Sequence, residues 1–470
     1  MTCFQRHRAT PHVRLRNCFG ASAIFSLSFV AFSLVAVSLV AGTAVQGQTN
    51  AALELPVTAA TVSTVPVTKA PMNQSTPVLP LAMRAPLRPD PEFIACLNRA
   101  RGAAVAQGAP ESAARAATQL IVAPDPEIIA ASQVQPEFRM PIWDYLAGLV
   151  DDERVTDGTA AFLSQEAYLR NLGIRTGVDP ATIAGVWGVE TNFGRILGKR
   201  KVIPSLATLG CTNWRRTNFF YSELIAAIRV QAAGHVSPDH FIGSWAGAFG
   251  QTQFMPSTFW RLAVDGNGDG RRDIIDEPRD ALASTANYLR NSGWVRGQVW
   301  GYEVRVPAGY RGPSGRTNKR ALSIWHNAGF VQGDGTPLPE TSIGYGLIMP
   351  AGPQGPGFLV GRNFDAVYAY NPAESYALAV NLLADRIKGG QGIIGRWPTD
   401  DLPLNRNGRR DLQRLLLRLG YDIGEPDGII GPKSRSAIVD LQRKAFMQVD
   451  GRAGEKSLAA ARLEIARQTP

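Results

Sequence analysis

Apolar residues recur three and four positions apart in most segments between residues 93 and 388, which predicts helices. The segments with this spacing are Phe93 to Gly108, Ile142 to Val150, Gly158 to Leu172, Tyr221 to Ala233, Ser257 to Val264, Ala281 to Ser292 and Ser375 to Lys388. Strand patterns are few, namely Trp300 to Val306 and Phe358 to Val360. The Gly- and Pro-rich stretch from Tyr310 to Pro356 is expected to be irregular loop of the kind that lines a groove. The pattern therefore predicts a mainly α domain of the α+β class with a small β element.

One further helical segment carries a glutamate where its period demands an apolar side chain. Asp179 and Pro180 are typical of a helix start. On the face shared with Glu190 stand three apolar residues, Ile183, Val186 and Trp187. Burial disfavours the ionised carboxyl and raises its pKa, so that it can donate a proton to a leaving oxygen. Glu190 is therefore a general-acid candidate, and the alternatives are a glutamate buried against an arginine or one turned to solvent.

The N-terminus has four arginines and no acidic residue in its first eighteen positions, followed by an apolar run from Phe19 to about Ala44. This arrangement predicts an export signal in residues 1–47, with an uncleaved inner-membrane anchor as the alternative. Residues 48–90 are rich in Ala, Thr, Val and Pro and are predicted to be a flexible linker. We therefore expect a periplasmic protein.

The formal net charge is +10, and removal of the four arginines would leave about +6. Outside the cytoplasm, a basic protein meets anionic wall polymers and membrane surfaces rather than nucleic acid, although its charge can also serve solubility alone. An oxidising compartment favours a disulfide between Cys96 and Cys211 over two buried thiols. The sequence has no HExxH motif and no Cys/His cluster, so zinc chemistry is not supported.

The sequence changes character near Trp397, and residues 399–470 are predicted to form a separate module after a domain at 91–398. One predicted helix is rich in leucine and is closed by Gly420, and a second carries Ile438 and Leu441. A DGxxG turn occurs twice, at 427–431 and at 450–454. About 65 residues suffice for a small helical module with a modest core.

Residues 243–257, GSWAGAFGQTQFMPS, combine small residues with polar side chains and aromatic rings. Ser244, Gln251 and Gln253 supply neutral donors and acceptors, while glycines let a ligand approach the backbone. This mixture suits a sugar. It is also typical of a tightly packed corner between a helix and a loop.

The segment after Val264 has the spacing of a calcium-binding loop. Such a loop has ligands at positions 1, 3, 5, 9 and 12, a carbonyl at position 7 and glycine at position 6. These positions hold Asp265, Asn267, Asp269, Asp273 and Asp276, with the carbonyl of Arg271 and with Gly270. Asp276 departs from the usual glutamate and has a shorter reach. A structural calcium ion and a hydrated acidic turn are the two interpretations.

Four motifs together resemble the lytic transglycosylase B family of peptidoglycan-cleaving enzymes. They are VWGVETNFG, GSWAGAFGQTQFMPSTF, DGNGDGRRDIIDEPRDALASTANYL and FLVGRNFDAVYAYNPAESYALAVNLLADRI. The resemblance covers roughly residues 91 to 398, and LQRLLLRLGYDIGEPDGIIGPKSRSAIVDLQ in the tail resembles a small helical peptidoglycan-binding domain. It implies a lysozyme-like α+β catalytic domain that cuts the β-1,4 bond between N-acetylmuramic acid and N-acetylglucosamine without hydrolysis. The products would carry 1,6-anhydromuramoyl ends.

The resemblance also implies roles for single residues. Glu190 matches the single catalytic acid/base, and Ser244 matches the serine that orients it. Gln253, Tyr370 and Asn371 match residues that bind the substrate. The substrate's own acetamido group and 6-hydroxyl would replace the second carboxylate of a hydrolase, so the chemistry needs no cofactor.

Two other functions stay open on the sequence alone. The first is a non-catalytic scaffold that binds peptidoglycan, against which the intact Glu190 argues. The second is a hydrolytic muramidase, which would require Asp239 or Asp265 to face Glu190. The expected partners are glycan strands, and the sequence identifies no protein partner.

Overall fold

The computed structural model describes residues 88–133, 140–212 and 216–468. The predicted signal or anchor and nearly all of the predicted linker lie outside these residues. Among the helices in this part of the chain, none is both long and apolar enough to cross a membrane.

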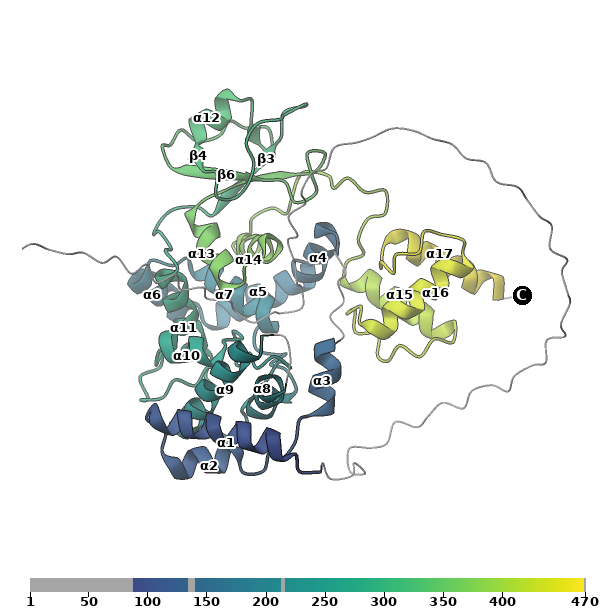
Figure 1. The fold of residues 1–470 in the computed structure, drawn as a ribbon. Helices are drawn as coiled ribbons and strands as arrows, with labels where there is room; N and C mark the ends of the chain where they lie inside the picture. The colour runs from purple at the N-terminus through teal and green to yellow at the C-terminus, as the bar shows by residue number, and fades with distance from the viewer. Residues whose placement is uncertain (1–87, 134–139, 213–215, 469–470) are drawn as a thin grey trace, which may run out of the picture.

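Residues 91–387 form a helical body with a small sheet above it (Figure 1). Its helices are α1 (Pro91–Ala106), α2 (Glu111–Thr118), α3 (Pro126–Gln133), α4 (Ile142–Leu149), α5 (Asp152–Ser164), α6 (Glu166–Thr176), α7 (Pro180–Thr191), α8 (Val202–Cys211), α9 (Thr217–Ala232), α10 (Pro256–Leu262), α11 (Pro278–Asn291), α12 (Leu322–Asn327), α13 (Arg362–Tyr370) and α14 (Glu374–Ile387). The prediction of a mainly helical α+β domain is confirmed.

Five antiparallel strands form the sheet, in the order β4-β6-β7-β3-β5. Their bounds are β3 (Gly301–Arg305), β4 (Arg320–Ala321), β5 (Val331–Gln332), β6 (Gly344–Ile348) and β7 (Gly357–Val360), and a separate pair joins β1 (Arg200–Lys201) to β2 (Ile242–Gly243). The expectation of irregular loop between Tyr310 and Pro356 is wrong, because this stretch contains β4, α12, β5 and β6. Strand β6 is buried next to β7, so tertiary pairing outweighs its glycine content.

Helix α7 lies at the centre of the body and packs against α14, α5, α11 and α6. Two of its glycines make this close packing possible, since a Cβ at Gly185 would lie 2.6 Å from the carbonyl oxygen of Val380 and one at Gly188 would lie 2.5 Å from the ring of Phe193. Cys96 of α1 and Cys211 of α8 form a disulfide across 115 residues of chain.

The C-terminal module consists of α15 (Arg406–Arg418), α16 (Pro432–Lys444) and α17 (Glu455–Gln468), which share a separate hydrophobic core. The repeated DGxxG turns have repeated supports. Gln413 accepts the N–H of Gly428 at 2.7 Å, and Gln442 accepts the N–H of Gly451 at 2.8 Å. The helical module predicted from the sequence is confirmed.

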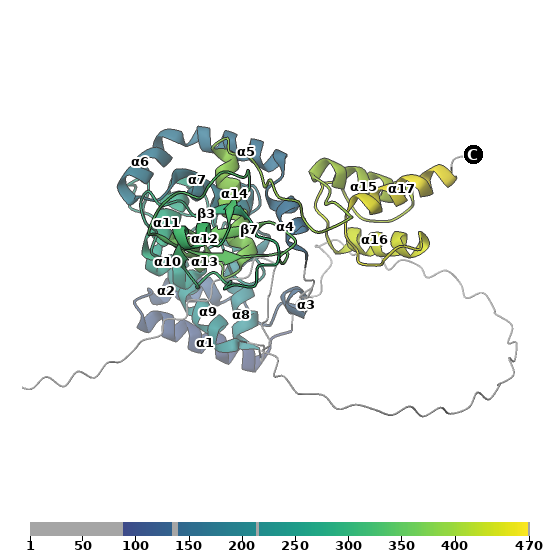
Figure 2. The same ribbon diagram turned by 90° about the horizontal axis from the view of Figure 1, so that it is seen from above.

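This module lies beside α4 and α5 of the helical body in both views (Figures 1 and 2). The contact is largely ionic: Arg406 and Arg410 bond Glu153, and Arg452 bonds Asp144 with two nitrogens. The Arg452 guanidinium also lies over the ring of Trp143, on α4, at 5.8 Å from its centroid.

Candidate functional site

Glu190 stands in the last turn of α7, where the central helix emerges from the core. Ile183 and Val186 are 0% exposed and Trp187 is 5% exposed, as the sequence predicted, whereas Glu190 itself is partly exposed. The helix is buried on every side from Ala181 to Gly188. Side chains become exposed only toward its C-terminal end, and no single face of the helix is exposed along its length. The carboxyl therefore lies at the boundary between the core and the surface, neither enclosed nor projecting into bulk water.

A buried tyrosine holds the Glu190 carboxyl. The hydroxyl of Tyr376, on α14, donates to Glu190 Oε1 at 2.7 Å. Burial and then the charge on Glu190 raise the pKa of Tyr376 well above its usual value, so this hydroxyl stays a donor. Burial and Glu190 also raise the pKa values of Tyr145 and Tyr370, which places three tyrosines around one carboxyl.

Tyr376 and Tyr145 were not identified from the sequence. Tyr376 is 186 residues from Glu190 in the chain, and its segment has an ordinary helical apolar pattern. Only the order of the motifs, which places AESYALAV one residue beyond the Tyr370-Asn371 pair, could have drawn attention to it.

The segment GSWAGAFGQTQF folds into a packed corner beside α7. Gly243 and Phe249 form a bridge, as do Phe249 and Phe254, and every residue from 246 to 254 is buried. A Cβ on Gly243 would lie 2.1 Å from the carbonyl oxygen of Ala248, so the turn requires glycine at this position. The tightly packed interpretation of this motif therefore describes its backbone.

Gln251 fastens this corner to the helix of Glu190. Its side-chain oxygen accepts the indole N–H of Trp187 at 3.0 Å, and its main-chain oxygen accepts the hydroxyl of Thr191 at 2.6 Å. Its side-chain nitrogen donates to the carbonyl of Ile275 at 2.9 Å. Gln251 is thus a positioning residue for the end of α7, a role that the sequence did not reveal.

The residues expected to bind substrate have different environments. Ser244 is partly exposed, and its hydroxyl accepts the N–H of Ala248 at 3.1 Å. Gln253 is 8% exposed with φ of 52°, and its amide donates to the carbonyls of Leu197 and Gly250. Both side chains therefore stabilise the corner, and their roles toward a sugar stay predictions.

Tyr370 and Asn371 lie where α13 ends. Tyr370 is 1% exposed and donates its hydroxyl to the carbonyl of Thr252 at 2.6 Å. Its ring stacks on that of Tyr376 at 6.4 Å between centroids, and its role in substrate binding stays a prediction. Asn371 is partly exposed, and its role toward substrate stays a prediction.

The carboxylates of the predicted calcium loop accept hydrogen bonds from main-chain N–H groups of the same loop. The Asp265 carboxylate accepts the N–H groups of Gly268 and Gly270, and Asp269 accepts that of Arg271. Asp273 accepts the N–H groups of residues 275 and 276. Within the described residues, no group of three or more His, Cys, Asp or Glu side chains is arranged to hold a metal ion.

Asp276 does not occupy the twelfth-ligand position expected from the sequence. Its carboxylate faces His240, with Oδ2 at 2.7 Å from Nδ1. The carboxylate that closes the loop is Asp280, which is 0% exposed and accepts the N–H groups of Gly266, Asn267 and Asp273. Within the described residues the ligand set expected from the spacing is therefore not assembled, and calcium binding by this loop stays a prediction.

Two family models match the chain. The model described as transglycosylase SLT domain matches residues 92–385, and the model of a peptidoglycan binding domain matches residues 405–460. The membrane-bound lytic murein transglycosylase B of Escherichia coli (strain K12) is 33% identical over 240 residues, which cover 50% of this chain and 64% of that protein.

Solved structures give the same result. SltB3 from Pseudomonas aeruginosa, in complex with NAG-anhNAM-pentapeptide, is 42% identical with a TM-score of 0.64, and the match covers 79% of this chain and 100% of that one. Slt35 from Escherichia coli, solved with bulgecin A and also with calcium, is 26% and 27% identical with a TM-score of 0.54, over 64% of this chain and 93% of that one. The transglycosylase SLT domain model matches well over half of the residues of this chain, and the chain therefore belongs to the transglycosylase SLT domain family.

Proposed function

We propose that this chain is a peptidoglycan lytic transglycosylase. It would cleave the β-1,4 bond between N-acetylmuramic acid and N-acetylglucosamine and leave 1,6-anhydromuramoyl ends, with Glu190 as the single acid/base. The observation that carries the proposal is one carboxyl at the emerging end of an otherwise buried helix, bonded by Tyr376. Family membership and the anhydro-sugar complex of the similar SltB3 support it.

The reaction would proceed in two proton transfers. Glu190 first gives its proton to the glycosidic oxygen as the bond from the muramic acid C1 breaks, while the neighbouring acetamido group supports C1. The 6-hydroxyl of the same sugar then attacks C1, and Glu190 takes the hydroxyl proton. The 1,6-anhydro ring closes, Glu190 is again protonated, and no water and no cofactor are consumed.

The tyrosines would keep Glu190 in one orientation for both transfers. Tyr376 donates to Oε1, and its ring is fixed by burial and by the stack on Tyr370. A hydrogen bond to a charged group contributes about 1.5–3 kcal/mol, which is sufficient to hold a side chain in one rotamer. Ser244 would orient the acid further, and Gln253 and Asn371 would contact sugar.

The two aspartates that a two-carboxylate hydrolase would require to face Glu190 have other described contacts or surroundings. A hydrolase needs a second carboxylate about 5–9.5 Å from the acid. Of the two candidates, Asp265 bonds its own loop, and Asp239 is exposed next to Pro238, where its main chain bonds Lys201.

Glu190→Gln tests the proposal. Digestion of purified sacculi should release anhydro-ended muropeptides with the wild-type chain and none with Glu190→Gln, while the variant still binds sacculi. Glu166→Gln, which changes a partly exposed side chain in the first turn of α6, is the control and should cut normally. Reducing ends by mass spectrometry would instead identify a hydrolase, and no release by the wild type would leave a non-catalytic scaffold.

The surrounding organisation belongs to the same proposal. Residues 91–398 would be the catalytic domain and 399–470 the peptidoglycan-binding domain. The basic, apolar N-terminal segment at 1–47 would export the chain to the periplasm or anchor it in the inner membrane, followed by a linker at 48–90. Cell fractionation combined with N-terminal sequencing of the mature protein distinguishes a cleaved signal from an anchor.

A further inference from the structure

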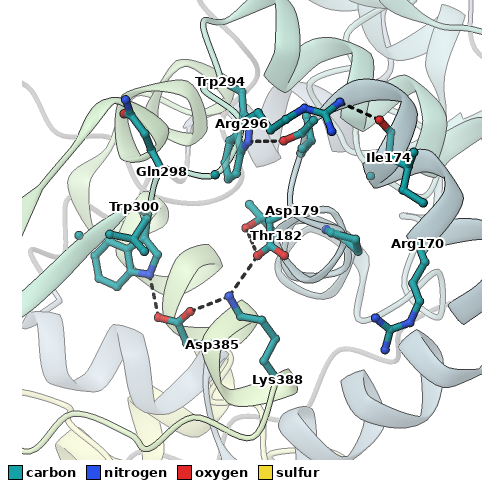
Figure 3. Close-up of a pocket in the computed structure, with 17 residues that line it drawn as sticks. Arg170, Ile174, Asp179, Thr182, Trp294, Arg296, Gln298, Trp300, Asp385 and Lys388 are labelled. Carbon is teal, nitrogen blue, oxygen red and sulfur yellow. Dashed lines mark hydrogen bonds and ion pairs between the residues drawn. The ribbon is translucent and has the colours of Figure 1, made fainter. Parts of the chain in front are cut away.

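A cavity of about 620 Å³ opens at the N-terminal end of α7, opposite the end that carries Glu190 (Figure 3). Four segments line it: the end of α6, the first turn of α7, the loop from residue 294 to 301 and the end of α14. Its volume is in the range of about 300–1,000 Å³ that is typical of small-molecule sites. The mechanism proposed above uses none of its side chains.

The walls of this cavity are fixed by hydrogen bonds. The indole N–H of Trp294 donates to the carbonyl of Gly177 at 3.0 Å, and Arg296 donates to the carbonyl of Ile174 at 2.7 Å. The amide of Asn363, which is 0% exposed, bonds the main chain of the 294–301 loop at two residues. The cavity is therefore preformed, as ligand sites usually are.

The charges of the cavity largely neutralise one another. Lys388 Nζ lies 3.2 Å from Asp179 and 3.1 Å from Asp385, and Figure 3 shows it pointing between them. Asp179 also accepts the hydroxyl of Thr182, and Asp385 accepts the indole N–H of Trp300 at 2.7 Å. A strongly charged ligand would have to break these pairs. A neutral ligand can instead donate its hydroxyl and amide protons to the carboxylate oxygens of Asp179 and Asp385, which have lone pairs beyond these contacts.

Aromatic surface and glycine backbone complete the lining. Trp294 supplies a partly exposed apolar ring, and Gly297, at which a Cβ would meet no atom within 4 Å, lets a ligand approach the main chain. We propose that this cavity binds one N-acetylhexosamine unit of a peptidoglycan glycan strand, outside the catalytic groove. The inference rests on the proposed function, because that function makes the glycan strand the ligand of the chain.

The bound unit cannot be the one that is cleaved. Eleven residues separate Asp179 from Glu190, and at 1.5 Å per residue the two ends of α7 are about 16 Å apart. A second attachment raises the effective concentration of substrate at the groove when both sites bind one polymer or cross-linked strands. The cavity would therefore increase activity on intact sacculi and leave activity on short glycans unchanged.

Two variants of the full chain test the cavity, with chitotriose, the trimer of N-acetylglucosamine, as the probe. Trp294→Leu removes the flat ring, and Lys388→Gln replaces the ammonium with a neutral amide. The matched control is Trp260→Leu, because Trp260 is also partly exposed and also donates its indole N–H to one carbonyl, that of Ala226 at 3.0 Å. Circular dichroism melts show whether each variant is folded.

Calorimetric titration in the Glu190→Gln background should show both cavity variants losing at least about fivefold in affinity at one chitotriose site, which corresponds to one hydrogen bond. Without the Glu190 change, both should need more sacculi for half-maximal rate and should keep wild-type turnover on a short soluble glycan. Trp260→Leu should change neither measurement.

An unchanged titration in both cavity variants would overturn the inference, as would an equal loss of turnover on the short glycan. Weaker binding of free stem peptide with unchanged chitotriose binding would overturn the saccharide assignment. These results are separate from a failure of the proposed function, which is read from the muropeptides that the wild-type chain releases.

Discussion

Asp151 connects the two domains through its negative charge. This charge can be removed without removing the cap that Asp151 provides for α5. It caps α5 by accepting the N–H of Arg154 at 3.1 Å. The same carboxylate lies 3.3 Å from Arg406 and 3.7 Å from Arg409, both on α15, and its side chain is 2% exposed. Asp151→Asn preserves the cap, because asparagine caps as well as aspartate, and deletes only the negative charge.

The free energy lost in Asp151→Asn depends on which contacts Arg406 and Arg409 retain. Arg406 retains an ion pair with Glu153 at 3.0 Å, whereas Arg409, which is 10% exposed, loses its only described ion pair and keeps hydrogen bonds to three carbonyls. Removing one partner of a buried pair costs about 3–5 kcal/mol where the remaining charge cannot reach water. Here Arg409 can reach water if the C-terminal module leaves α4 and α5, so the loss appears as undocking rather than unfolding.

A cost of about 3–5 kcal/mol corresponds to a shift of roughly two to three and a half orders of magnitude in the docking equilibrium. Small-angle X-ray scattering of the full chain should show a larger radius of gyration for Asp151→Asn. The linker before α15 should also become more sensitive to protease. Asp422→Asn is the control, because it removes an exposed pair with Lys433 and such pairs contribute about 0–1 kcal/mol. An Asp151→Asn protein with the wild-type scattering profile and protease resistance would refute this account of the interface.

Three further predictions concern single side chains. Tyr376→Phe removes the hydrogen bond to Glu190 but keeps the buried ring, so turnover on sacculi should fall by roughly 10- to 150-fold with little change in melting temperature. Hydrogen bonds from two arginines of the C-terminal module lower the pKa of Glu153 to about 2. Its contribution to docking is therefore complete above the ordinary pKa near 4.5 and is lost as the pH falls toward 2, a dependence that scattering at several pH values should show and Glu153→Gln should reduce. Asp276→Asn should leave the melting temperature in calcium and in chelator the same as for the wild type, since Asp276 faces His240 rather than the loop; a calcium response that disappears in this variant would contradict the geometry.

The sequence predicted the helix of Glu190 but not the way in which the helix is buried. The period of Ile183, Val186 and Trp187 implies one inward face, whereas α7 is enclosed on all sides and Glu190 is partly exposed because it lies near the end of the helix. Local periodicity cannot distinguish these arrangements, because the helices that enclose α7 include α14, about 190 residues later in the chain. The same limit explains why Tyr376 was missed.

In the sheet, the sequence pattern predicted one strand and missed its neighbour. Strand β7 was predicted because Phe358 to Val360 is apolar, but β6 has two glycines in five residues and lacks a strand pattern. It becomes a strand because Leu347 pairs with Leu359 of β7 and Gly344 pairs with Ala321 of β4. Pairing partners of this kind are set by tertiary structure, so the composition of the segment does not predict that it forms a strand.

Arg154 lies next to the Asp151 contact with the C-terminal module and also bonds α7, so the proposed docking role of Asp151 and the proposed catalytic role of Glu190 can be tested separately. Arg154 follows the cap of α5 and donates Nη1 to the carbonyl of Gly188 at 2.6 Å, two residues before Glu190. Burial and then the charge of Arg406 lower the pKa of Arg154 to about 10, so it remains a cation near neutral pH, and at the C-terminal end of α7 it complements the helix dipole. This bond lies entirely within the catalytic domain and does not require a docked module. Asp151→Asn should therefore lower activity on sacculi, for which the module supplies binding, and preserve turnover on a short soluble glycan; loss of both would mean that the interface supports the position of Glu190 itself.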